Sequence, residues 1–114
     1  SIDNPANKKY QAAFKAKYGR GGSEFAVQGY DAARVIVEAL KVVNGDTSDK
    51  KAFMDAVRKV TFDGPRGKFR FDQKNGNIIQ NIYVYKNIKQ GGAITASVYD
   101  VIKDVQDPSD SCKS

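Results

Sequence analysis

The stretch SEFAVQGYDAARVIVEALKVV, residues 23–43, decides the fold of this chain. A few polar residues interrupt it at intervals of three or four, so on a helix they fall in one narrow stripe: Gln28, Asp31, Arg34, Glu38 and Lys41. The other positions are apolar or small, and a helix that is apolar over most of its circumference has to be covered on several sides. Ser23 is a suitable N-cap, and Asn44-Gly45 is a suitable end. The sequence therefore predicts a largely buried helix over residues 23–43.

Two further helices are predicted, one on each side of this stretch. Asn4-Pro5 is typical of an N-cap followed by proline at the first helical position, and Gly19 ends the helix that follows. Its aromatic residues recur every four positions and are expected to pack on one face: Tyr10, Phe14 and Tyr18. After Gly45, the cluster at residues 46–49 can cap a third helix with an ordinary apolar stripe over residues 53–60.

Beyond residue 60 the period of the apolar residues changes to two, which indicates strands. Residues 62–67 are rich in turn formers, and Asn75-Gly76 marks a second turn. About three strands are predicted, over residues 68–71, 78–86 and 94–99. On the second strand Tyr83 and Tyr85 are expected on the solvent side, and residues 103–114 are expected to form a flexible tail. The order is three helices followed by about three strands, which is a mixed α/β chain.

The composition excludes several classes of protein. A chain of 114 residues with 40% hydrophobic and 28% charged residues forms one domain at most and is neither disordered nor membrane-spanning. There is no histidine, and the single Cys112 can form neither an internal disulfide nor a cysteine cluster for zinc. No carboxylates stand at a spacing that pairs them for acid–base chemistry. We therefore expect no enzyme, no catalytic residue, no metal and no cofactor.

The net charge of +6 suggests an alternative, a small basic interaction or nucleic-acid-binding module. Gly64-Pro65-Arg66-Gly67 has the spacing of a phosphate-binding Gly-x-x-Gly loop, but it leads into a strand and not into a second helix. Gly19-Arg20-Gly21-Gly22 lacks both the preceding strand and the spacing of a dinucleotide-binding loop. We interpret it as a helix end followed by a flexible connection.

Phe25 is distinguished by its position in the first turn of the central helix, beside this glycine-rich connection. A side chain placed there can project into a cleft. Taken alone, a phenylalanine is nevertheless more often a packing residue, because burial is its commoner fate.

From Asn4 to about Tyr85 the chain resembles the C-terminal part of the periplasmic leucine/isoleucine/valine-type substrate-binding proteins of ABC transporters. The resemblance rests on the order and spacing of several pieces. They are NPAN at 4–7, the helix through Phe14 and Tyr18-Gly19, FAVQGYDAA at 25–33, FDGPRG at 62–67 and FRFD at 69–72.

The resemblance implies a type I periplasmic binding fold, in which two α/β lobes close over a small ligand in the cleft between them. It implies a receptor that captures a branched-chain amino acid, or a related small amide or aromatic acid, and delivers it to an ABC permease. The helices and the first hairpin would belong to the N-terminal lobe. The later strands would return to the hinge and the second lobe.

The resemblance also carries one ligand contact onto this sequence. The aromatic residue that begins the block at 25–33 lines the ligand side-chain pocket in relatives, and Phe25 occupies that place. This correspondence favours a ligand-contact role for Phe25 over a packing role. Tyr30 and Asp31 are interpreted as packing and hinge support, and most of the other ligand contacts of the family come from upstream segments.

Members of the family are several times longer than this chain, which begins without methionine and without the pattern of a secretory signal. We therefore expect residues 1–114 to be a C-terminal fragment of a periplasmic receptor. The helix at 23–43 would then lack most of the sheet that covers it. An isolated fragment should expose apolar surface and open strand edges, and we expect it to self-associate by exchanging elements between copies.

Overall fold

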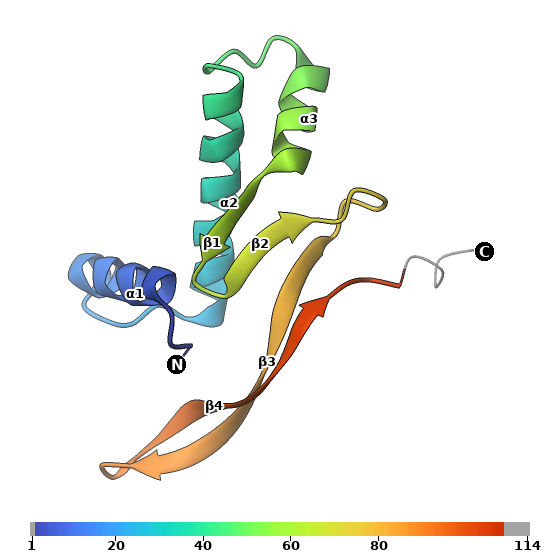
Figure 1. Cartoon of the computed structure of the whole chain (residues 1–114). Coiled ribbons are helices and arrows are strands. Elements are labelled where there is room, and N and C mark those ends of the chain that lie inside the picture. Colours follow the sequence, from blue (N-terminus) through green and yellow to red (C-terminus); the bar gives the residue numbers. More distant parts are fainter. Residues whose placement is uncertain (1, 109–114) are drawn as a thin grey trace.

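The computed structural model describes residues 2–108 and contains three helices followed by four strands (Figure 1). The elements are α1 (Pro5–Tyr18), α2 (Glu24–Val42), α3 (Lys50–Lys59), β1 (Thr61–Gly64), β2 (Gly67–Phe71), β3 (Ile78–Gln90) and β4 (Ala93–Val105). The predicted mixed α/β order is confirmed, with one strand more than expected. Cys112 and the last residues of the predicted tail lie outside the described residues.

The helices begin and end where the capping residues predict. Asn4 caps α1 by accepting a hydrogen bond from the backbone N–H of Asn7, and Pro5 follows at the first turn. Ser23 caps α2 through the N–H of Ala26 in the same way. Gly19 ends α1 with a φ of +69°, a left-handed conformation that glycine adopts without a steric penalty.

The hydrophobic core lies where α2 and α3 pack against the β1–β2 hairpin. It is built from one side of each element: Val35, Ala39, Ala56, Val60, Phe62 and Phe69. Phe62 and Phe69 are partners in the register of β1 and β2, and their rings stack with centroids 4.8 Å apart. This pair therefore connects the sheet to the helices above it.

Helix α2 is less covered than its sequence predicts. A single line of side chains four residues apart is buried, namely Val27, Asp31, Val35 and Ala39. Ile36, Val37 and Val42 remain exposed although they are apolar. The helix is covered on one side and not on several, and the expected exposed apolar surface is present.

The four strands follow one another in a purely antiparallel sheet of order β1-β2-β3-β4. Strand β1 was not predicted, because its residues 62–64 belong to the turn-rich segment. A two-residue turn, Pro65-Arg66, joins it to β2. The turn is therefore shorter than the composition suggested.

Strands β3 and β4 extend well beyond the rest of the sheet as a two-stranded arm, defined here as residues 80–105 (Figure 1). β3 pairs with β2 only at Ile78 and Ile79 and then with β4 alone. The loop predicted at residues 87–92 is wrong, because pairing continues to Gln90↔Ala93 and leaves Gly91-Gly92 as the turn. β4 also continues to Val105, so residues 103–105 of the predicted tail belong to a strand.

Candidate ligand-binding site

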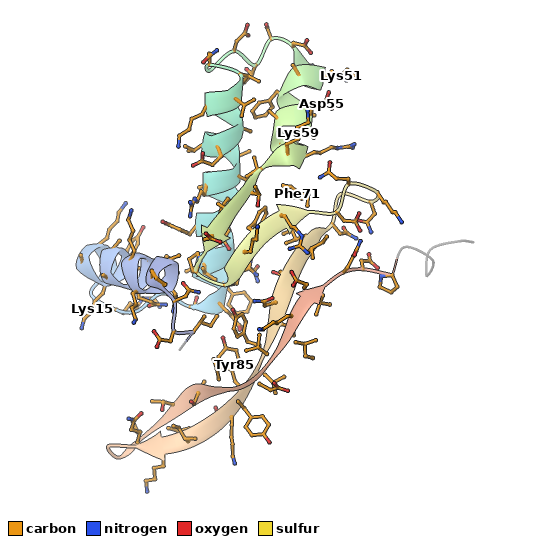
Figure 2. The ribbon with its side chains drawn as sticks, viewed as in Figure 1. Lys15, Lys51, Asp55, Lys59, Phe71 and Tyr85 are labelled. Carbon is orange, nitrogen blue, oxygen red and sulfur yellow. The ribbon has the colours of Figure 1, made fainter. Side chains whose placement is uncertain are left out.

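An open pocket of about 680 Å³ lies between the helices and the arm. Its walls come from α1, the start of α2, the Pro65-Arg66 turn and β3. Tyr85 projects from β3 toward the helical part of the molecule (Figure 2). Tyr83 and Tyr85, which were expected on the solvent side of their strand, both line this open pocket, and Tyr85 is 45% exposed.

The connection between α1 and α2 forms one edge of the pocket and is held in place by Gln11. The side-chain amide of Gln11 donates to the carbonyl of Gly22 (3.0 Å), and its oxygen accepts from the N–H of Gly22 (2.9 Å). A Cβ on Gly22 would overlap the ring of Tyr10, so only glycine allows this close approach. The interpretation of this segment as a flexible connection is thus replaced by a specific packing role.

Phe25 lies in the first turn of α2 and lines the pocket. Its side chain is 74% exposed and belongs to neither the core cluster nor an aromatic pair among the described residues. The packing interpretation therefore does not describe this residue. An exposed aromatic ring at the rim of a pocket is available to contact a ligand.

Asp31 belongs to the polar stripe of α2 but is buried. The guanidinium of Arg66 donates to its Oδ2 through Nε (3.2 Å) and Nη2 (3.1 Å). Its Oδ1 is also buried and has no hydrogen-bond partner among residues 2–108. Burial raises the pKa of Asp31 above its ordinary value, and the neighbouring Arg66 opposes this rise.

The ion pair between Asp31 and Arg66 also argues against the nucleic-acid-binding alternative. A Gly-x-x-Gly loop binds phosphate through open backbone N–H groups and nearby cations. Here Gly64 and Gly67 pair with each other across a tight hairpin turn, and the one arginine between them points to Asp31. The turn therefore serves packing inside the molecule.

Tyr30 does not reach the pocket. Its ring packs against Tyr10 with centroids 5.1 Å apart, and it borders a second, smaller hollow of about 300 Å³ between α1 and α2. Of the predicted site residues, Phe25 lines the pocket, Asp31 is paired with Arg66, which also lines it, and Tyr30 borders the smaller hollow instead. Their assigned roles in ligand contact and hinge support stay predictions.

Several residues that line the pocket were not predicted to be site residues: Tyr10, Gln11, Arg66, Tyr83 and Tyr85. The alternation of β3 placed Tyr83 and Tyr85 on a common face but did not indicate which face meets the pocket. Burial raises the pKa of Tyr85, and the charge of Glu24 adds to this rise. The start of α2 and the middle of β3 are therefore close in space, about 60 residues apart in the chain.

The side chains that line the pocket offer aromatic rings, amides and hydroxyls, together with the carboxylate of Glu24 and the guanidinium of Arg66, which is paired with Asp31. The described part of the chain contains no group of three or more Cys, His, Asp or Glu side chains arranged to hold a metal ion. Within residues 2–108, no helix is both long enough and apolar enough to span a membrane.

Comparison with known families identifies the class of protein. The family model described as periplasmic binding protein matches residues 1–93. The chain belongs to this family of periplasmic binding proteins. A comparison with curated proteins found no match.

Solved structures of ABC-transporter receptors are similar to the chain in both fold and sequence. An ABC transporter substrate-binding protein from Sphaerobacter thermophilus is 30% identical with a TM-score of 0.86, over 90% of this chain and 28% of that one. A solute-binding protein from Rhodopseudomonas palustris BisB5, in complex with 3,4-dihydroxybenzoic acid, is 31% identical with a TM-score of 0.83, over 94% and 29%. One from Rhodopseudomonas palustris HaA2, in complex with p-hydroxybenzoic acid, is 28% identical with a TM-score of 0.81, over 96% and 30%. The chain thus spans less than a third of the length of these solved relatives.

Proposed function

We propose that this chain is the C-terminal part of a periplasmic solute receptor that binds a small aromatic carboxylic acid. The observation that carries the proposal is the exposed ring of Phe25 at the rim of a pocket that Tyr83 and Tyr85 also line. Two relatives of about 30% identity are solved with hydroxylated benzoic acids, which supports the same class of ligand.

The lining of the pocket suits an aromatic ligand better than an aliphatic one. Aromatic rings pair in offset or edge-to-face arrangements that contribute about 0.5–1.5 kcal/mol beyond the area they bury. The hydroxyl of Tyr85 lines the same pocket and can pair with a polar ring substituent, whereas the hydroxyl of Tyr83 already donates to the carbonyl of Arg66.

The proposed mechanism is closure and not chemistry. In a two-lobed receptor, a ligand that contacts both lobes favours the closed arrangement by its differential affinity. The arm leads away from the helices and would carry the chain toward the hinge and the second lobe. The receptor in this proposal is periplasmic, and an ABC permease recognises its closed form.

The test is a calorimetric titration of the complete receptor that contains this segment. The panel comprises benzoate, 4-hydroxybenzoate, 3,4-dihydroxybenzoate, leucine, isoleucine and valine. We expect at least one aromatic acid to bind with a Kd at least tenfold lower than that of any of the amino acids. Tighter binding of an aliphatic amino acid would overturn the assigned class of ligand.

A pair of variants places the contact at Phe25. Phe25→Ala should weaken binding of the aromatic acid about tenfold, because a buried aromatic contact is lost. Tyr99→Ala removes another exposed aromatic side chain, which lies on β4 outside the pocket, and should leave the Kd unchanged. Equal affinities for Phe25→Ala and the wild type would remove Phe25 from the site.

A further inference from the structure

Three elements meet at the Pro65-Arg66 turn. Asn4, the N-cap of α1, donates through Nδ2 to the carbonyl of Pro65 (3.0 Å). The side chain of Arg66 forms the ion pair with Asp31 of α2. The hydroxyl of Tyr83 on β3 donates to the carbonyl of Arg66 (3.0 Å). The turn therefore connects the walls of the pocket to one another.

A glycine makes the approach of β3 to this turn possible. Gly67 follows the turn with a φ of +98°, in the left-handed region that favours glycine. A Cβ at this position would lie 2.9 Å from Nδ2 of Asn81 and 3.4 Å from the hydroxyl of Tyr83. The bare backbone of Gly67 thus leaves the space through which Tyr83 reaches Arg66.

The bond from Tyr83 has no equivalent elsewhere between the arm and the first part of the chain. In the described structure it is the one hydrogen bond that joins residues 80–105 to residues 2–67. The other side-chain bond that leaves the arm, from Arg70 to Asp104, leads to strand β2, and Gln106, just after the arm, donates to Asp72 in the turn after β2. Those bonds hold the base of the arm and do not reach the pocket.

We propose that Tyr83 and Arg66 are positioning residues for ligand binding, since the bond between them and the Asp31–Arg66 ion pair fix β3 relative to α2. This inference rests on the proposed function of the pocket. Phe25 stands on α2, and Tyr83 and Tyr85 stand on β3, so the separation of these two elements sets the width of the pocket. Holding that width before the ligand arrives lowers the ordering cost of binding.

Removal of one hydroxyl tests this arrangement in the complete receptor. Tyr83→Phe keeps the ring but loses the bond to Arg66, and the Kd for the ligand found in the calorimetric panel should rise about three- to tenfold. Tyr99→Phe removes a hydroxyl from an exposed tyrosine of β4 and should leave the Kd unchanged. A thermal unfolding curve shows that each variant is folded.

A distance measurement separates positioning from a general loss of stability and needs no ligand. Spin labels on cysteines replacing the exposed Lys15 of α1 and Lys89 of β3, in a Cys112→Ser background, report the separation of helix and arm. The distribution of distances should broaden in Tyr83→Phe and not in Tyr99→Phe.

The possible outcomes distinguish this inference from the proposed function. If the receptor binds none of the aromatic acids, the proposed ligand class fails, while a broadened distribution still supports the positioning role. If Tyr83→Phe leaves the distribution of distances unchanged, the positioning role is overturned, even where the Kd of the ligand rises.

Discussion

Phe25 and Phe69 have the same side chain but opposite surroundings. Phe69 is 6% exposed and stacked on Phe62, whereas Phe25 is 74% exposed. We expect Phe69→Ala to lower the free energy of unfolding by about 3–5 kcal/mol, as is usual for a buried phenylalanine. Phe25→Ala should change it by less than about 0.5 kcal/mol, as is usual at the surface. Urea denaturation of both variants measures the difference, and a large loss for Phe25→Ala would show that its ring is packed.

Asp31 predicts a particular dependence of stability on pH. Its pKa is raised in the folded protein from an ordinary value of 3.8, so the folded state holds this proton more tightly than the unfolded state does. The contribution of Asp31 to the free energy of unfolding therefore falls as pH rises from about 4 through the raised pKa, and is constant above it. Urea denaturation of the wild type and Asp31→Asn at successive pH values should show the wild type losing stability relative to the variant.

Asp55 provides the contrast for this measurement. The hydrogen bond and charge of Lys51, the residue one turn earlier in α3, lower the pKa of Asp55 (Figure 2). Its contribution therefore increases as pH rises through the interval up to 3.8, opposite in sign to that of Asp31. A wild type that gains stability relative to Asp31→Asn as pH rises would contradict the burial of that carboxyl.

The burial of Asp31 could not be predicted from the sequence. Spacing places Asp31 in the polar stripe of α2, and most residues of such a stripe are solvated. Its burial depends on Arg66, which is 35 positions away and reaches α2 only because the turn folds back. Local spacing contains no information about that partner.

Gly67 and Gly29 have different surroundings in their elements. Gly67 has a positive φ and close neighbours in β3, while Gly29 lies within α2 with no atom near its missing Cβ. Gly67→Ala should lower the free energy of unfolding by more than about 1 kcal/mol. Gly29→Ala should raise it by up to about 1 kcal/mol, because alanine favours the helix. Thermal denaturation compares them, and equal effects would contradict the strain at Gly67.

Helix ends were predictable and strand bounds were not. Asn4, Ser23 and Gly19 act through neighbours within four residues, so their roles can be read from local sequence. Strand β1 was missed because pairing with β2 places turn-forming residues in a ladder. The arm was underestimated because residues 87–90 are exposed and, apart from Ile88, polar, so that their pairing with β4 identifies them as a strand.

At the scale of the whole molecule, apolar residues remain exposed on α2 and on the arm, and the outer edge of β4 is unpaired in the described chain. Open edges and apolar patches favour association with another copy. Light scattering after size exclusion should give a mass above the 12.5 kDa of one chain, and it should rise with concentration.

Two substitutions locate this contact. Ile94 and Tyr99 are more than two-thirds exposed on β4, and replacement of both by lysine should reduce the measured mass. Ala12→Lys adds a charge on an exposed position of α1 and serves as the control. A single chain mass at every concentration would contradict the self-association.

The pocket forms only at the scale of the whole molecule. Its walls come from residues as distant as Tyr10 and Tyr85, and they meet only after the hairpin, the turn and both helices have formed. The sequence placed Phe25 at the start of α2, and resemblance to a family suggested its role. The surrounding side chains depend on tertiary contacts, which residue spacing alone does not define.

The exposure of Phe25 has a consequence for how this chain can evolve. Because its ring contributes little to the core, substitutions at this position do not destabilise the fold enough to be removed by selection. The side chain at this position can therefore change while the fold stays intact. Arg66 lacks that freedom, because a change there leaves the buried carboxylate of Asp31 without its partner.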